Sequence, residues 1–199
     1  MSREEKKNEI FRAASQVFFS KGFEKTKIED IAKQAGIGKG TVYEYFESKL
    51  QLFEETIAFY HQNVINSLCE ALARWENIGD KIKAYAQFMT EIISNHIHLF
   101  ELMADSRVMA REMGAVILES NIRMGDVLLE AVTEAISKGE LRPDLEPRLI
   151  TSTILGTVTQ YCSLKIMFSE PETQKIDYDR LVDAVMRGVG AEAISNQTS

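Results

Sequence analysis

The chain has 199 residues, 45% of them hydrophobic and 27% charged, so it is long enough to bury a core and too apolar for a disordered protein. Only three prolines and eleven glycines interrupt it, which favours long helices, and no alternating strand pattern with tight-turn dipeptides stands out. No apolar run reaches 18 residues and the N-terminus is charged, which argues against a membrane span or a secretory signal. We therefore expect an all-α, cytoplasmic protein without membrane contact.

The net charge of −7 is unevenly distributed along the chain. Residues 1–49 hold ten Lys and Arg against eight Asp and Glu, which makes this end +2 and leaves −9 on the rest. An acidic body repels nucleic acid, so the N-terminal end is the plausible surface for DNA.

Cysteine and histidine usage gives no sign of a cofactor or metal. Cys69 and Cys162 each lie in an apolar helical pattern without a C-x-x-C motif, which predicts two buried thiols in a reducing compartment, with a redox sensor as the alternative. The histidines follow no metal-binding spacing, and no catalytic constellation appears, so we expect neither a cofactor nor an enzyme.

The first predicted helix covers residues 2–21. Ser2 and Glu5 form a capping box at its start, an apolar stripe follows one face, and Gly22 is placed to end it. The stripe needs a partner, and the two short helices that follow offer a matching apolar face.

Residues 26–49 read as two short helices, about 27–35 and 39–45, with Thr26 and Glu29 as the capping box of the first. Ala32, Gly36 and Val42 follow the spacing of a helix-turn-helix, in which the glycine allows a left-handed turn. A structural helical hairpin is the alternative. The exposed face of the second helix carries side chains that can bond phosphates and base edges, namely Lys39, Thr41, Tyr43 and Tyr45.

The remaining chain predicts further helices, about nine in all. Ser48 and Gln51 open a long helix over 49–75, Asp80 caps the next over 80–95, and a bend separates a short helix over 96–103. The last three are expected over 107–138, 144–168 and 177–189. We expect a DNA-binding domain over 1–48, an effector-binding and dimerisation domain over 49–190, and a flexible tail over 191–199.

The run Gly38-Lys-Gly-Thr-Val-Tyr-Glu-Tyr-Phe46, with Thr26, Ile31-Ala32 and Ser48-Lys49 around it, resembles the TetR family of bacterial transcriptional regulators. The resemblance covers about a quarter of the chain. It implies a homodimer that binds a palindromic double-stranded operator through the third helix, and a C-terminal domain that binds a small effector and lowers DNA affinity.

By position, the resemblance implies contacts to bases and phosphates from Lys39, Gly40, Thr41 and Tyr43, and contacts to backbone phosphates from Thr26, Lys27, Tyr45 and Lys49. Two positions depart from the family pattern. Gly38 stands where serine or threonine is frequent, which weakens the helix cap. Glu44 lies on the exposed helix face, where it either accepts a hydrogen bond from cytosine N4 or points to solvent.

The body is rich in methionine and aromatic residues, which indicates either a plain core or, given the implied pocket, a site for a largely apolar effector. The predicted lining residues are Phe88, Met89, Phe100, Met103, Met124 and Tyr161. One short recognition helix binds too little DNA alone, so we expect a dimer. The predicted dimer interface is formed by Thr153, Gly156, Thr157, Gln160, Leu181 and Val185, with packing inside one chain as the alternative.

The sequence thus predicts a ligand-responsive, dimeric transcriptional regulator, and a repressor rather than an activator. The alternatives from other classes are a helical interaction module that binds no DNA and a helical enzyme.

Overall fold

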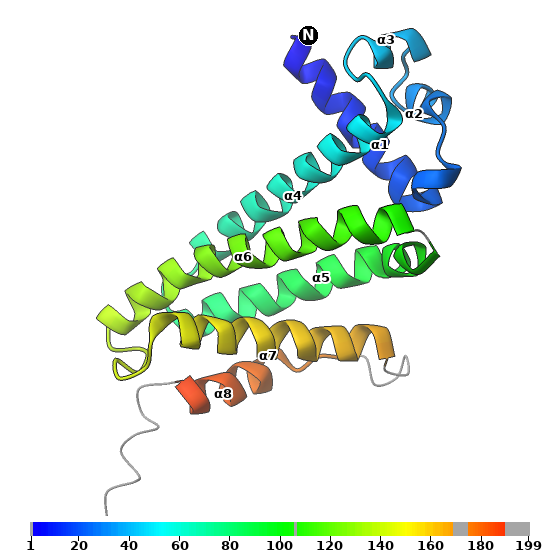
Figure 1. Ribbon diagram of the computed structural model, residues 1–199. Coiled ribbons are helices and arrows are strands. Elements are labelled where there is room, and N and C mark those ends of the chain that lie inside the picture. The colour runs from blue at the N-terminus through cyan, green and yellow to red at the C-terminus, as the bar shows by residue number, and fades with distance from the viewer. Residues whose placement is uncertain (1, 106, 169–174, 190–199) are drawn as a thin grey trace, which may run out of the picture. The chain divides into compact units, whose positions relative to one another are not determined.

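The computed structural model describes the backbone of residues 2–105, 107–168 and 175–189; for residues 96–105, 107–113, 116, 117, 120 and 189 only the backbone is described. Over these ranges the chain forms eight α-helices (Figure 1). They are α1 (Arg3–Lys25), α2 (Ile28–Gln34), α3 (Lys39–Tyr43), α4 (Lys49–Ala73), α5 (Ile78–Asp105), α6 (Arg107–Ser137), α7 (Pro147–Phe168) and α8 (Tyr178–Val189). The expected all-α class is confirmed.

The helices form two compact units. Unit 1 contains residues 1–65 and 96–120, and unit 2 contains residues 66–95 and 121–199. The chain therefore passes between the units within α4, α5 and α6, whereas the predicted domain boundary lay between residues 48 and 49. The predicted tail over 191–199 lies outside the described residues.

An aromatic core holds the first three helices against the start of α4 in unit 1. Phe18 and Phe53 are fully buried, with ring centroids 4.9 Å apart in an edge-to-face arrangement. Phe11 of α1 contacts Phe46, which follows α3, at 5.4 Å. Burial of a side chain of this size is worth about 1.5–3 kcal/mol. These contacts hold α1 against α4 and against the end of α3, and they support α2 and α3, whose 7 and 5 residues are too few to be stable alone.

Local signals at the N-terminal end are confirmed in part. Ser2 and Glu5 form the expected capping box, and Gly22 has a φ of 77° that interrupts α1. The predicted Thr26–Glu29 box is wrong, because the Thr26 hydroxyl donates to the Gly22 carbonyl at 2.7 Å. Lys27 is instead the N-cap residue of α2, and the Asp30 carboxylate accepts from its amide.

Three expectations for the body are corrected. Residues 96–103 continue α5 without a separate helix, since no proline or glycine interrupts the segment after Gly79. Asn77 rather than Asp80 caps α5, because its side-chain oxygen accepts from the Asp80 amide at 2.8 Å. Cys162 is buried as expected, but Cys69 is exposed on α4.

Lys49, at the start of α4, closes the end of α1. Its ammonium donates to the carbonyl oxygens of Phe23 at 2.8 Å and Thr26 at 3.1 Å, with a longer contact to Glu24 at 3.4 Å. The same Nζ lies 4.3 Å from the centre of the Phe23 ring. These carbonyls belong to the last residues of α1 and the link to α2, so one cation joins α4 to the start of the helix-turn-helix.

We predict that Lys49→Met lowers the free energy of unfolding by about 2 kcal/mol, because hydrogen bonds from a charged donor are among the stronger ones and their acceptors lose their partner. Urea denaturation followed by circular dichroism measures the change. Lys25→Met, which removes an exposed cation from the same region, is the control. Equal midpoints for Lys49→Met and the unmodified chain would contradict the clamp.

Candidate nucleic-acid interface

The turn between α2 and α3 has the geometry that the glycine spacing predicted. Gly36 adopts a φ of 64°, and its amide donates to the Lys33 carbonyl at 3.2 Å. The next amide, of Ile37, donates to the Ala32 carbonyl at 2.9 Å, which closes the C-terminus of α2. The chain then reverses within a few residues, and α3 begins at Lys39.

The packing of α3 fixes which of its residues face outward. Val42 is fully buried and Phe46, one turn later, is 2% exposed. Gly38 precedes the helix and provides no side-chain cap, as expected from a glycine at this position. A Cβ added to Gly40 would meet nothing within 4 Å, so tight packing inside this chain does not account for the glycine.

Lys39 is not a free cation in the isolated chain. Its ammonium lies 2.6 Å from the Glu29 carboxylate of α2 and 5.8 Å from the centre of the Tyr43 ring. The hydrogen bond to Lys39 lowers the pKa of Glu29, and the same bond raises the pKa of Lys39. Both groups are exposed, so the pair is weak enough for a DNA phosphate to compete with Glu29 for the cation.

The other predicted DNA-contact residues divide into two groups. Lys27 is exposed and forms no ion pair among the described residues, and Tyr43 is 47% exposed. Thr26 is 1% exposed and its hydroxyl is used inside the chain, and the ammonium of Lys49 binds the carbonyls of α1. Phosphate contacts through these last two side chains would require their present bonds to break, and they remain a prediction.

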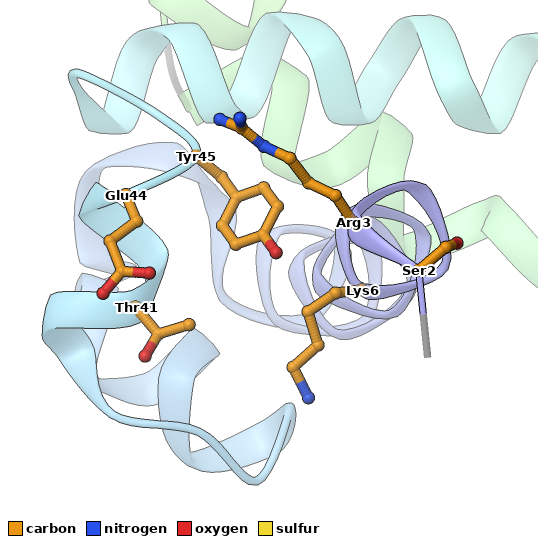
Figure 2. Close-up of a pocket in the computed structure, with 6 residues that line it drawn as sticks. All are labelled: Ser2, Arg3, Lys6, Thr41, Glu44 and Tyr45. Carbon is orange, nitrogen blue, oxygen red and sulfur yellow. The ribbon is translucent and has the colours of Figure 1, made fainter.

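Sequence reasoning overlooked a groove between α1 and the end of α3 (Figure 2). Its volume is about 690 Å³, and Ser2, Arg3 and Lys6 line it from the α1 side. Thr41, Glu44 and Tyr45 line it from the other side, and the Arg3 guanidinium lies 5.6 Å from the centre of the Tyr45 ring. The sequence feature that could have indicated this groove is the pair of basic residues at positions 3 and 6. The same pair is equally expected at the solvent-exposed start of an ordinary helix.

In unit 2 the predicted effector residues have mixed exposure. Met89 and Met124 are 7% and 6% exposed, and Phe88 and Tyr161 are half-buried. The side chains of Phe100 and Met103 lie outside the described residues. A smaller groove of about 240 Å³ between α6 and α7 is lined partly by Asn121, Gly125, Arg148 and Leu155.

The predicted dimer residues also separate into two sets. Gly156, Thr157 and Gln160 are exposed on α7 and Thr153 is half-buried there. Leu181 and Val185 are only 6% and 3% exposed, because α8 turns them into the core of unit 2 and α7 packs along α8 (Figure 1). Both side chains are buried within this chain, and their part in a dimer interface stays a prediction.

The part of the chain that the structure describes lacks two further features. No helix there is long and apolar enough to cross a membrane. The same residues contain no group of three or more His, Cys, Asp or Glu side chains that could hold a metal ion.

Two short helices joined by a glycine turn, with an exposed polar second helix, define a helix-turn-helix DNA-binding protein. The family model described as bacterial regulatory proteins, tetR family, matches residues 10–56, which include α2, the turn and α3.

Relatives with known names match over most of the chain. The fatty acid metabolism regulator protein of Bacillus subtilis is 26% identical over 189 residues, which cover 89% of this chain and 90% of that protein. The transcriptional repressor KstR2 of Mycobacterium tuberculosis is 24% identical over 161 residues, which cover 76% and 77% of the two chains.

Solved structures match the fold. The fatty acid degradation regulator FadR of Bacillus halodurans superimposes with a TM-score of 0.64 at 22% identity, covering 94% of this chain and 95% of that one. FadR of Bacillus subtilis, in complex with stearoyl-CoA, gives a TM-score of 0.61 at 21% identity and covers 90% and 95%. Over residues 10–56 the chain thus matches the tetR family of bacterial regulatory proteins, and its helical fold is similar to that of these solved regulators.

We predict that Glu29→Gln raises DNA affinity about two- to fivefold at low salt, because Lys39 then reaches a phosphate without leaving its exposed ion pair. Fluorescence anisotropy with a labelled duplex measures the affinity, and the gain should shrink as salt is added. Glu47→Gln removes an equally exposed carboxylate after α3 and serves as the control. Equal gains in both variants would mean that net charge, rather than the Lys39 pair, sets the affinity.

Proposed function

We propose that this chain is a cytoplasmic transcriptional repressor that binds a palindromic operator as a homodimer and leaves it when an apolar effector binds. The observation that carries the DNA-binding part is the outward face of α3, which is fixed by the burial of Val42 and presents Lys39 and Tyr43 to solvent. In this proposal residues 1–48 contact DNA, and residues 49–190 bind the effector and form the dimer.

Each protomer would place α3 in the major groove of one half-site. The two half-sites of a dimer lie about 34–36 Å apart, or a multiple of that distance, on the same side of the duplex. Lys39 and Lys27 would bind phosphates, and Thr41 and Tyr43 would reach base edges. Binding through phosphates releases counterions, so the affinity should fall steeply as salt rises.

The exposed side of α7 supports the dimer. Leu149, Leu164 and Phe168 are 55%, 47% and 76% exposed, which is unusual for side chains of this size. Gly156 lies between them along the helix, and a Cβ there would meet nothing within 4 Å. A stripe that is apolar at both ends and small in the middle suits the close approach of an identical helix across a two-fold axis.

The effector is proposed to be a molecule with a long hydrocarbon part, and a long-chain acyl-CoA is the first candidate. Two observations support this choice: the buried Met89 and Met124 in unit 2, and the relatives, one named for fatty acid metabolism and one solved with stearoyl-CoA. Methionine side chains adapt to flexible apolar ligands. The helix α4 belongs to both units and could therefore transmit effector binding to the start of the DNA-binding part.

We predict that Lys39→Ala combined with Tyr43→Ala lowers operator affinity about 100-fold, since each contact contributes roughly 1–3 kcal/mol. The operator is first selected from a random DNA pool with the unmodified chain. Circular dichroism and sedimentation check that the variant stays folded and keeps its oligomeric state. Lys175→Ala, in the acidic body, is the control and should bind as the unmodified chain does. A non-DNA interaction module would be supported if the double variant retained every activity of the protein.

We also predict that saturating stearoyl-CoA weakens operator binding at least tenfold, because an effector changes affinity only through different binding to the two states. Coenzyme A without the acyl chain is the matched control, and anisotropy of a labelled operator is the measurement. By linkage, operator DNA should weaken stearoyl-CoA binding by the same factor. Tight binding of stearoyl-CoA with unchanged operator affinity would exclude it as the effector.

A further inference from the structure

Glu44 is the C-cap residue of α3 and is exposed at the end of the helix. The α-helical hydrogen bonds continue past Tyr43, since the Glu44 amide donates to the Gly40 carbonyl and the Phe46 amide to the Val42 carbonyl, both at 3.1 Å. Glu44 and Gly40 each lie two residues from the buried Val42, which places them roughly 160° around the helix from it. The two positions are one turn apart on one face, and Gly40 leaves the space beside Glu44 open.

The carboxylate also shares a surface with a residue predicted to contact bases. Thr41 and Glu44 line the same groove, three residues apart on the helix (Figure 2). A major groove that admits Thr41 therefore also receives Glu44. Glu44 is exposed and forms no ion pair among the described residues, so its two oxygens are available as acceptors.

A carboxylate that enters the major groove is repelled by the negatively charged phosphates, and nearby positive charge has to offset this repulsion. The groove supplies one, because Arg3 and Lys6 of α1 line its opposite side. The Arg3 guanidinium rests over the Tyr45 ring at 5.6 Å, which holds it near the end of α3. Cations in this position can bind phosphates of the strand that borders the major groove while they make the electrostatic potential at Glu44 less negative.

We propose that Glu44 is a base-reading residue, whose carboxylate accepts a hydrogen bond from the N4 amino group of cytosine in each half-site, while Arg3 and Lys6 bind adjacent phosphates. This inference rests on the proposed operator binding through α3 and adds a specific base and two further cations to it. In the major groove the amino group of cytosine is a donor, which suits a carboxylate and excludes the carbonyl acceptor of guanine.

The test compares sequences selected from a random double-stranded DNA pool by the full-length chain and by Glu44→Gln. The unmodified chain should select a C·G pair at one position of each half-site. Glu44→Gln should lose this preference and favour adenine there, because a glutamine amide pairs with adenine N6 and N7. Its affinity for the unmodified operator should fall about tenfold.

Glu47→Gln is the matched control, because it removes the same charge from an exposed residue outside the groove. It should select the unmodified motif. An unchanged motif for Glu44→Gln, or the same shift in both variants, overturns the assignment. Failure of the proposed function looks different, because the unmodified chain would then enrich no motif at all.

A second variant tests the cations separately. Arg3→Ala combined with Lys6→Ala should select the same motif as the unmodified chain but bind it more weakly. The slope of log affinity against log salt should become less steep by about two, one for each lost phosphate contact. An unchanged slope and affinity would remove Arg3 and Lys6 from the interface.

Discussion

The burial of Val42 and Phe46 is the constraint on which the DNA-binding end depends. Helix α3 has five residues, too few to hold its own orientation, and these two side chains attach it to the aromatic core of unit 1. The rings of Phe46 and Phe11 of α1 lie 5.4 Å apart between centroids, so contact with α1 fixes the phase of α3, that is, its rotation about its own axis. Once that phase is fixed, Gly40 and Glu44 have to face outward. Packing in the core therefore determines which residues of α3 are exposed.

A second constraint is the position of α4 relative to the helix-turn-helix within unit 1. Its first residue, Lys49, binds carbonyls at the end of α1, and Phe53 packs against Phe18 and Phe23. The Lys49 ammonium and the phenylalanine rings contact the same end of α1, where Gly22 interrupts the helix with a positive φ. Lys49, whose position resembles that of a residue that binds DNA phosphates, thus stabilises the fold of the isolated chain.

Much of this end was predictable because its signals are local. Gly22 and Gly36 both have positive φ, at the predicted end of the first helix and in the predicted turn of the helix-turn-helix. The N-cap of α2 was predicted one residue too early, at Thr26 instead of Lys27. Each of these residues is followed three positions later by an acidic residue, and the Thr26 hydroxyl donates to the preceding Gly22 carbonyl rather than capping α2. The bend predicted before residue 96 was wrong for a related reason, since the polar residues there break an apolar pattern without breaking the helical backbone.

The groove and the burial of α8 could not be predicted from local signals. Arg3 and Glu44 lie 41 positions apart in sequence, and only the packing of α1 on the core brings them to one groove. For α8, Leu181 and Val185 formed an apolar stripe that suits a partner chain and the chain's own core equally well, and periodicity does not tell these apart.

The charges around α3 show why a weakly basic end is enough for this kind of protein. Lys39 is paired with Glu29 and Lys21 with Asp30, at 2.6 and 3.2 Å, so part of the positive charge is neutralised before DNA is met. Exposed pairs of this kind cost little to open, whereas the acidic remainder of the chain repels DNA everywhere else. Non-specific binding depends almost entirely on phosphate contacts, while specific binding adds base contacts. Because phosphate contacts contribute to both kinds of binding, a surface with few free cations weakens both, and base contacts then supply a larger share of the specific affinity.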